Sequence, residues 1–214
     1  MEMKGKFITF EGGEGCGKST QIARLADALS ESGVEFVCVR EPGGTRLAEF
    51  VRSLLKDEEK DPPTDRAELL LFLAARAQLV EKVIKPALDA GKWVISDRFS
   101  DSTFAYQGYG RGMSLGVIRV ANDFACAGLT PDLTLLLDVA PETALARMRG
   151  REEATGSTAD RIERGGAGFH SRPRKGFGGL AAAGPDRIRR IDAHRAPGEG
   201  WAVSFTHLPL PTKR

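Results

Sequence analysis

Between Phe10 and Thr20 the chain reads FEGGEGCGKST, which sets four glycines beside a lysine and two hydroxyl groups. Residues Gly12 to Ser19 fit the pattern G-x-x-x-x-G-K-[ST] of a phosphate-binding loop. Glycine lets the backbone turn its N–H groups toward phosphate oxygens, and a helix beginning near Lys18 adds its positive end. Lys18 can reach the β- and γ-phosphates, and the Ser19 hydroxyl can bind Mg²⁺. The expected ATP-binding residues are Gly12, Gly13, Glu14, Gly15, Cys16, Gly17, Lys18, Ser19 and Thr20.

Asp97 and Arg98 follow an apolar run and indicate which reaction the loop serves. The chain has no Asn/Thr-Lys-x-Asp motif of a guanine-reading switch, and no second acidic residue follows Asp97 to hold a hydrolytic water. An arginine in that place can bind an anionic second substrate bidentately. The pair therefore predicts a kinase whose acceptor is itself a phosphate.

The composition bounds the kind of protein that carries these residues. At 214 residues, with 41% hydrophobic and 28% charged content, the chain is long enough for one globular domain. No apolar run reaches the length of a membrane span, the N-terminus lacks a signal peptide, and three scattered cysteines suit a reducing compartment. A net charge of +2 gives no argument for a nucleic-acid partner. We expect a cytoplasmic protein that binds neither membrane nor nucleic acid.

Strands and helices alternate along the sequence and must position these residues. The runs KFITF, VEFVCVR, KWVISD and LTLLLDV are typical of strands, with RIRRIDA as a marginal last strand. Helical periodicity follows the glycine loop, runs from about Thr45 to Leu55, covers residues 65–90 and resumes at Pro141. This alternation without hairpin turns predicts a parallel sheet in one α/β domain.

Six ordered segments resemble the bacterial thymidylate kinase family, which phosphorylates dTMP to dTDP. They are EGGEGCGKST, REPGGT, LLLFLAARAQL, SDRFSDSTFAYQG, PDLTLLLDV and ADRIE, and the resemblance runs from about Lys6 to Ala193. It implies a P-loop NTPase-type three-layer fold, in which helices flank a five-stranded parallel sheet and a small lid covers about residues 147–161. It also implies ATP and dTMP as substrates, Mg²⁺ as the cofactor, and a homodimer.

The same resemblance assigns roles around the transferred phosphate. It gives Glu14 to the 3′-hydroxyl of dTMP and Arg98 to the acceptor phosphate. It gives Asp97 to Mg²⁺ through water, so that Ser19 and Asp97 form the expected metal site. From the residues alone, Glu14 could be a solvated loop acid and Asp97 the cap of the next helix.

The base site implied by the resemblance begins with Phe72 and Arg76, which are four apart and share one helix face. Phe72 resembles the residue that stacks on thymine, and Arg76 resembles the donor to its O4 atom. From the residues alone, Phe72 is typical of a core side chain. The other substrate-binding residues that the resemblance implies are Glu41, Pro42, Ser102, Thr103, Tyr106 and Gln107.

The negative charge on the transferred phosphoryl group requires an arginine near it, and loop positions 13–16 supply none. The segment that resembles the lid offers Arg147, Arg149, Arg151 and Arg161. Residues two apart on a helix face different directions, so these arginines cannot all serve one site. We favour Arg149 or Arg151 as catalytic, beside Lys18 and Arg98, and the alternative is a solvated basic face.

No general base is needed, because the acceptor phosphate is already ionised at neutral pH. Catalysis then consists of alignment, charge screening by Mg²⁺, Lys18 and arginine, and exclusion of water on lid closure. Three alternatives remain open at this stage. They are a kinase for another nucleoside monophosphate, a nucleotide-dependent binding or switch protein, and a catalytically impaired remnant.

The C-terminal part departs from the family pattern. Pro173 and several glycines fall where the family has a long helix, so we expect this helix to be broken or weakened near Pro173. These glycines are Gly165, Gly166, Gly168, Gly176, Gly178 and Gly179. After a kinase domain over residues 1–193, residues 194–214 contain three prolines and no helical periodicity, which predicts an irregular tail. Our hypothesis is a late shift of the coding frame, and the alternative is a basic arm for an acidic partner.

Overall fold

The computed structural model describes residues 5–56, 62–155 and 167–194 of the chain. Within them, five parallel strands form a sheet in the order β2-β3-β1-β4-β5. The strands are β1 (Phe7–Glu11), β2 (Phe36–Arg40), β3 (Trp93–Asp97), β4 (Leu133–Asp138) and β5 (Ile188–Asp192). Each coincides with a predicted strand, so the predicted α/β fold with a five-stranded parallel sheet is confirmed.

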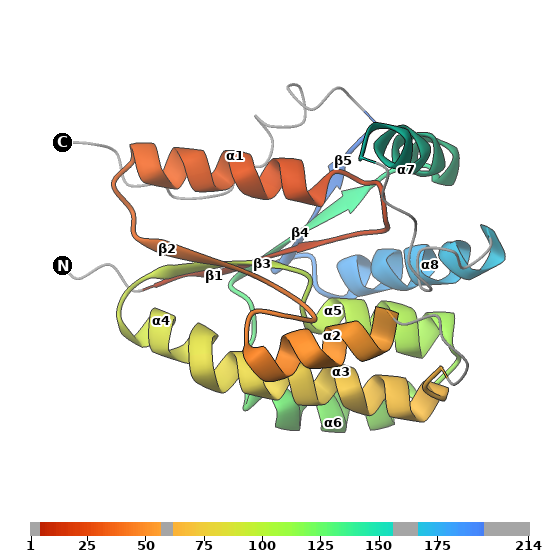
Figure 1. The fold of residues 1–214 in the computed structure, drawn as a ribbon, viewed down its shortest axis with the longest axis horizontal. Coiled ribbons are helices and arrows are strands. Elements are labelled where there is room, and N and C mark those ends of the chain that lie inside the picture. The colour runs from red at the N-terminus through yellow and green to blue at the C-terminus, as the bar shows by residue number, and fades with distance from the viewer. Residues whose placement is uncertain (1–4, 57–61, 156–166, 195–214) are drawn as a thin grey trace.

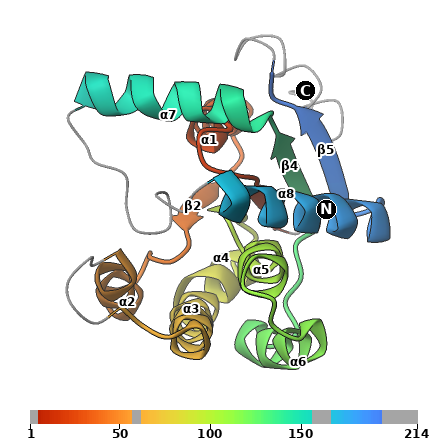
Figure 2. The same cartoon turned by 90° about the vertical axis from the view of Figure 1, so that its right-hand side faces the viewer.

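Helices cover both faces of this sheet. They are α1 (Lys18–Glu31), α2 (Arg46–Lys56), α3 (Asp65–Leu79), α4 (Lys85–Asp89), α5 (Ser100–Thr103), α6 (Leu115–Cys126), α7 (Pro141–Thr155) and α8 (Ala167–Ala183). Two π-helical segments, Val80–Ile84 and Phe104–Gly110, join α3 to α4 and extend α5. Helices α1 and α7 lie on one side of the sheet, and α2, α3, α4 and α6 lie on the other (Figure 1; Figure 2).

Successive side chains of β1 point to opposite faces of the sheet and pack against the helices on each face. Ile8 and Phe10 are buried in the cluster that contains Leu25 of α1. Phe7 points to the opposite face, where it packs with Leu79 at the end of α3. Strands buried on both faces explain the nearly continuous apolar runs in the sequence.

The carboxyl end of β1 is the place where the topology creates a site. β1 pairs with β3 on one side and with β4 on the other, and Phe10 is aligned with Asp97. The direction of strand addition reverses here, because β3 and β2 lie on one side of β1 and β4 and β5 lie on the other. Ligands of open α/β sheets bind at such a switch point, beyond the carboxyl ends of the strands.

The sequence predicts a helix that is broken or weakened near Pro173, and the structure shows no break there. Helix α8 runs from Ala167 to Ala183 with Pro173 inside it. Its inner side packs on the Phe104–Gly110 segment, where Phe177 meets the ring of Tyr106 edge-on at 6.1 Å. Tertiary packing of this kind supplies most of the stability of protein helices and outweighs weak propensity.

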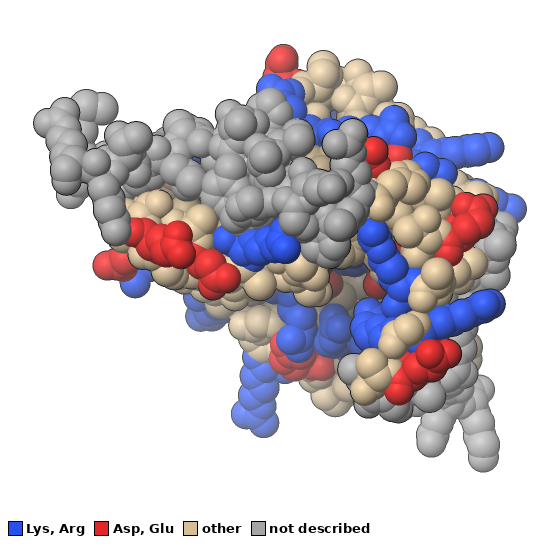
Figure 3. All heavy atoms as spheres, turned by 90° about the horizontal axis from the view of Figure 1, so that it is seen from above, with Lys and Arg blue, Asp and Glu red and all other residues tan. Residues whose placement is uncertain are grey.

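Parts of the predicted lid and tail cannot be compared with the structure. The lid from residue 156 on and the tail from residue 195 on lie outside the described residues. Within the described part, no helix combines the length and the apolar character that crossing a bilayer requires. On the face seen in Figure 3, basic and acidic side chains are interspersed, in line with the small net charge of +2.

Candidate active site

The loop Gly12–Ser19 joins β1 to α1, and its glycines give it its shape. Gly12 and Gly15 have φ angles of 139° and 69°. A Cβ atom at Gly12 would lie 2.4 Å from the carbonyl oxygen of Leu137. Gly17 is the N-cap of α1 and has no side chain to occupy the first N–H groups. Those N–H groups and the helix dipole are therefore available to a phosphate.

The side chains of this loop differ in what they can offer a nucleotide. Lys18 Nζ donates to the carbonyl oxygen of Gly13 at 3.1 Å. Ser19 and Thr20 are exposed at the start of α1. The side chain of Cys16 is 2% exposed and packs in the core, so only its backbone can face a phosphate.

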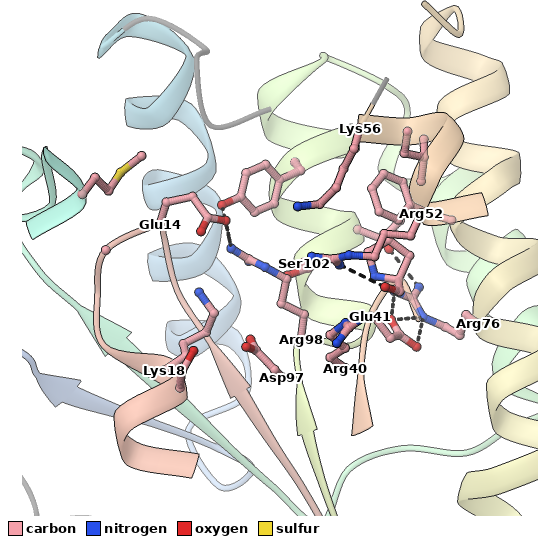
Figure 4. Close-up of a pocket in the computed structure, with 18 of the residues that line it drawn as sticks. Glu14, Lys18, Arg40, Glu41, Arg52, Lys56, Arg76, Asp97, Arg98 and Ser102 are labelled. Carbon is pink, nitrogen blue, oxygen red and sulfur yellow. Dashed lines mark hydrogen bonds and ion pairs between the residues drawn. The ribbon is translucent and has the colours of Figure 1, made fainter. Parts of the chain in front are cut away.

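Arg98, directly after β3, forms an ion pair with Glu14 of the loop (Figure 4). Its Nη1 atom also donates to the Gly12 carbonyl and to Ser102 Oγ, each at 3.0 Å. The face of the Tyr106 ring lies 5.1 Å from the guanidinium carbon. Burial raises the pKa of Glu14, but the charges of Arg98 and Lys18 outweigh it and lower that pKa to about 2. The two groups are thus held in their charged forms.

Asp97 carries the feature that most directly suggests a metal ion. Its Oδ1 atom is buried and finds no hydrogen-bond partner among the described residues. Asp97 and Ser19 line the same cavity. The described residues contain no cluster of three or more His, Cys, Asp or Glu side chains that could hold a metal alone. This donor set fits a hard cation that takes its other oxygens from phosphates and water.

A cavity of about 490 Å³ opens between the loop, the carboxyl ends of β2 and β3, and helices α2, α3 and α7. Its volume lies in the range of small-molecule sites. Phe72 of α3 lines this cavity and also packs against the buried cluster that Ala48, Val51 and Leu55 of α2 form with Ala75. The alternatives for Phe72, a core side chain or a base platform, therefore do not exclude each other.

Arg76 lines the cavity and is 2% exposed. It forms a buried ion pair with Glu41 at 2.6 Å, and burial raises the pKa of Glu41 despite the Arg76 charge. Its Nη1 atom donates to Thr103 Oγ1 at 2.8 Å and to Asn122 Oδ1 at 2.6 Å, and Nη2 also donates to the Phe99 carbonyl. All five N–H groups are engaged, so Arg76 can donate to a base only by releasing a present partner.

The chain matches the family model for thymidylate kinase over residues 10–199. It belongs to the thymidylate kinase family. It is 50% identical to the thymidylate kinase of Synechococcus sp. (strain JA-2-3B'a(2-13)), over 96% of this chain and 97% of that protein. It is also 50% identical to the enzyme of Oleidesulfovibrio alaskensis, over 90% of this chain and 92% of that protein. The thymidylate kinase structure from Ehrlichia chaffeensis superimposes with a TM-score of 0.71 at 40% identity, over 87% of this chain and 92% of that chain.

These similarities fix the fold and the class of the protein. It is a phosphotransferase with the P-loop NTPase fold, and as a thymidylate kinase it phosphorylates dTMP with ATP. The resemblance drawn from the six sequence segments is thereby confirmed, and nothing favours a switch protein or a remnant.

In this kinase, residues Ser102, Thr103, Tyr106 and Gln107, which the resemblance assigns to substrate binding, line one wall of the cavity. Gln107 Nε2 donates to the buried carboxylate of Glu68 at 3.1 Å. Because a carboxylate can only accept, the Gln107 amide is oriented with its carbonyl oxygen away from Glu68. Burial raises the pKa of Tyr106, which keeps its hydroxyl protonated beside Arg98.

Three basic residues that the sequence did not reveal as site residues line the same cavity of the kinase, namely Arg40, Arg52 and Lys56. Arg52 and Lys56 lie one turn apart on α2, and Figure 4 shows both extending into the cavity. Arg52 Nη1 donates to the Pro42 carbonyl at 3.0 Å. The four-residue spacing was visible in the sequence, but the placement of α2 above the cavity was not.

The arginines of the segment that resembles a lid separate along α7. Arg147 and Arg151, four apart and so on one helix face, line the cavity. Arg149 is exposed and is not among the lining residues. Arg161 lies outside the described residues. Of the two arginines that the sequence favoured, the structure brings Arg151 to the site and leaves Arg149 outside it.

Proposed function

We propose that ATP binds with its phosphates on the loop Gly12–Thr20 and that dTMP occupies the adjoining cavity, with its phosphate toward Arg98. The observation that carries this division is the position of Arg98. Its guanidinium contacts the Gly12 carbonyl and also lines the cavity (Figure 4). It therefore lies where the loop for one phosphate chain meets the space for a second substrate.

The thymine base belongs at the end of the cavity between Phe72 and the Ser102–Gln107 wall. Phe72 stacks on the ring, and the Gln107 carbonyl oxygen accepts the N3–H group that thymine presents. Arg76 fixes Glu41 and thereby the Glu41–Pro42 turn, and it reaches O4 only by exchanging a partner. Tyr106 crowds the sugar where a ribonucleotide carries its 2′-hydroxyl, and Glu14 binds the 3′-hydroxyl.

Transfer requires alignment and charge screening rather than proton abstraction. The acceptor phosphate of dTMP is ionised, so the chain needs to hold two anions in line. Lys18 and Arg98 screen the phosphates from the loop and the strand end, and Arg151 screens them from α7. Arg149 stays a prediction of the sequence with no place in this arrangement.

The metal in this proposal is Mg²⁺, which the Ser19 hydroxyl and, through water, the Asp97 carboxylate would hold beside the ATP phosphates. The unpartnered Oδ1 atom of Asp97 supports this assignment. When bound, the ion screens the charge that develops on the transferred phosphoryl group.

A homodimer in the cytoplasm completes the proposal. Helix α3 packs between α2 and α6 (Figure 2), and all three carry exposed apolar side chains. The largest exposures are those of Phe50 (65%), Leu70 (63%), Val117 (64%), Val120 (73%) and Phe124 (88%). Apolar exposure on adjacent helices is typical of an interface with another chain. Light scattering of the wild type and of Phe124→Asp tests this assembly, since a dimer should become a monomer.

The substrate assignment is tested with a panel of nucleoside monophosphates at saturating ATP. We expect kcat/KM for dTMP to exceed that for dCMP and dAMP by at least about a hundredfold, because the Gln107 carbonyl oxygen repels a base that presents an acceptor. Equal use of dCMP would show that the wall does not read the N3–H group. ATP binding without transfer to any monophosphate would indicate a switch protein instead.

A further inference from the structure

Glu11 is a buried carboxylate to which the proposed mechanism assigns no role. It is the last residue of β1, it is fully buried, and it does not line the cavity. Its Oε1 atom accepts from the backbone N–H groups of Phe99 at 2.8 Å and Ser102 at 3.2 Å. Its Oε2 atom accepts from Ser102 Oγ at 2.6 Å. All three donors belong to the turn that follows Arg98.

That turn has an unfavourable backbone conformation. Arg98 has a φ angle of 72°, in the left-handed region that residues with a side chain rarely adopt. Such a conformation persists only where the surroundings hold it. Ser96 Oγ donates to the Arg98 carbonyl at 2.6 Å, and the Arg98 N–H donates to the Phe10 carbonyl at 2.9 Å. Glu11 holds the part of the turn after Arg98, through Phe99 and Ser102.

The helical run that begins at Ser100 also needs an acceptor at its start. The residue before it is Phe99, whose side chain cannot accept the free N–H groups, and no side-chain cap is present. Glu11 supplies that acceptor from a neighbouring strand. It therefore fixes where the helix begins, directly behind Arg98.

Ser102 connects the same carboxylate to the guanidinium of Arg98. Arg98 Nη1 donates to Ser102 Oγ at 3.0 Å, and Ser102 Oγ donates onward to Glu11 Oε2. We propose that Glu11 is a positioning residue, which holds the Arg98 turn and, through Ser102, aims the Arg98 guanidinium at the acceptor phosphate. This inference rests on the acceptor-side role proposed for Arg98.

Burying the charged Glu11 carboxylate costs free energy, which argues against a side chain that only fills space in the core. Burial and the neighbouring Asp101 raise the pKa of Glu11 to about 7, although Arg98 and the bonds from the turn lower it. Arg76 and Arg187 are the other charged groups that interact with it. A neutral glutamine of the same shape would fill the space at less cost, but it could not accept all three hydrogen bonds.

The test compares steady-state kinetics of the full chain, Glu11→Gln and a control, with the fold checked by melting. In Glu11→Gln we expect KM for dTMP to rise about tenfold or more, as for the loss of a hydrogen bond to a charged group, with KM for ATP changed less than about twofold. The control is Asp132→Asn, a carboxylate that accepts from the backbone N–H of Phe7 at 2.8 Å and pairs with Lys6 at 2.9 Å, at the opposite end of β1 and away from the cavity. It should leave both KM values unchanged, whatever it does to stability.

A double-mutant cycle with Arg98→Ala decides whether Glu11 acts through Arg98. Glu11→Gln should add almost nothing in the Arg98→Ala background. An equal rise of both KM values, or the same loss in both backgrounds, would overturn the inference. If Glu11→Gln does not fold, Ser102→Ala breaks the same connection, and its effect must likewise vanish without Arg98. If Arg98→Ala itself leaves dTMP use unchanged, the proposed role of Arg98 fails instead.

Discussion

The Arg98 guanidinium and the Glu14 carboxylate, 84 residues apart in sequence, form an ion pair at the boundary between the phosphate loop and the acceptor cavity. Each has another partner in the proposed complex, since Arg98 binds a phosphate and Glu14 a sugar hydroxyl. In the proposed complex, substrate binding would exchange one internal ion pair for two contacts with dTMP. Until then, the pair keeps both charges oriented toward the site.

The pH dependence of stability reports on this pair. The pKa of Glu14 is lowered to about 2 from an ordinary value of 4.5, so the unfolded state binds the proton more tightly than the folded state. Glu14 thus contributes stability that is present above pH 4.5 and is lost as the pH falls toward 2. The contribution at neutral pH is on the order of 3 kcal/mol. In urea unfolding at pH 6 and pH 3.5, the wild type should lose more stability than Glu14→Gln. Equal losses would contradict the pairing.

Arg76 is expected to matter for stability as much as for the base. Arg76→Met leaves the Glu41 carboxylate buried without its partner, which should lower the free energy of unfolding by about 3–5 kcal/mol. Adding Glu41→Gln should recover part of the loss. The matched control is Arg40→Met, which breaks a more exposed pair with Glu49 and should cost at most about 1 kcal/mol. Similar losses in Arg76→Met and Arg40→Met would show that the buried pair is not structural.

The parts of the site that the sequence could predict are those encoded locally. The phosphate loop follows β1 and the Asp97–Arg98 pair stands at the end of β3, so their place at the carboxyl edge of the sheet follows from chain order alone. Arg52 and Lys56 could not be assigned, because only the packing of α2 on α3 brings them to the cavity. The full engagement of Arg76 depends on Thr103 and Asn122, which are distant in sequence.

Local propensity predicted a break that helix α8 does not show, because propensity ignores the partner on which the helix packs. Gly176 faces Tyr109, and a Cβ atom there would lie 2.7 Å from a ring carbon, whereas Gly178 has open space around its missing Cβ. Gly178→Ala should therefore raise the free energy of unfolding by about 0.5–1 kcal/mol, and Gly176→Ala should lower it. Thermal or urea unfolding of the two variants is the measurement. A stabilising Gly176→Ala would show that α8 does not pack on the ring of Tyr109.

The arginines of the segment that resembles a lid offer a matched pair for kinetics. Arg151 lines the cavity and Arg149 does not, although they are two residues apart on the same helix. We expect Arg151→Ala to lower kcat by at least about tenfold, since an arginine that screens the transferred phosphoryl group contributes a large factor. Arg149→Ala should change kcat less than about twofold. The reverse order would place Arg149 at the phosphates and contradict the position of α7.

In the proposed complex, Arg98 binds the phosphate of the acceptor dTMP and Lys18 binds the phosphates of the donor ATP. Calorimetric titration of ATP and of dTMP into Arg98→Ala and Lys18→Ala tests this assignment most directly. In Arg98→Ala we expect dTMP affinity to fall at least about tenfold, with ATP affinity changed less than about threefold, since a charged hydrogen bond to phosphate is lost on one side only. Lys18→Ala should show the opposite pattern. An equal fall of both affinities in Arg98→Ala would contradict the division of the site between the two residues.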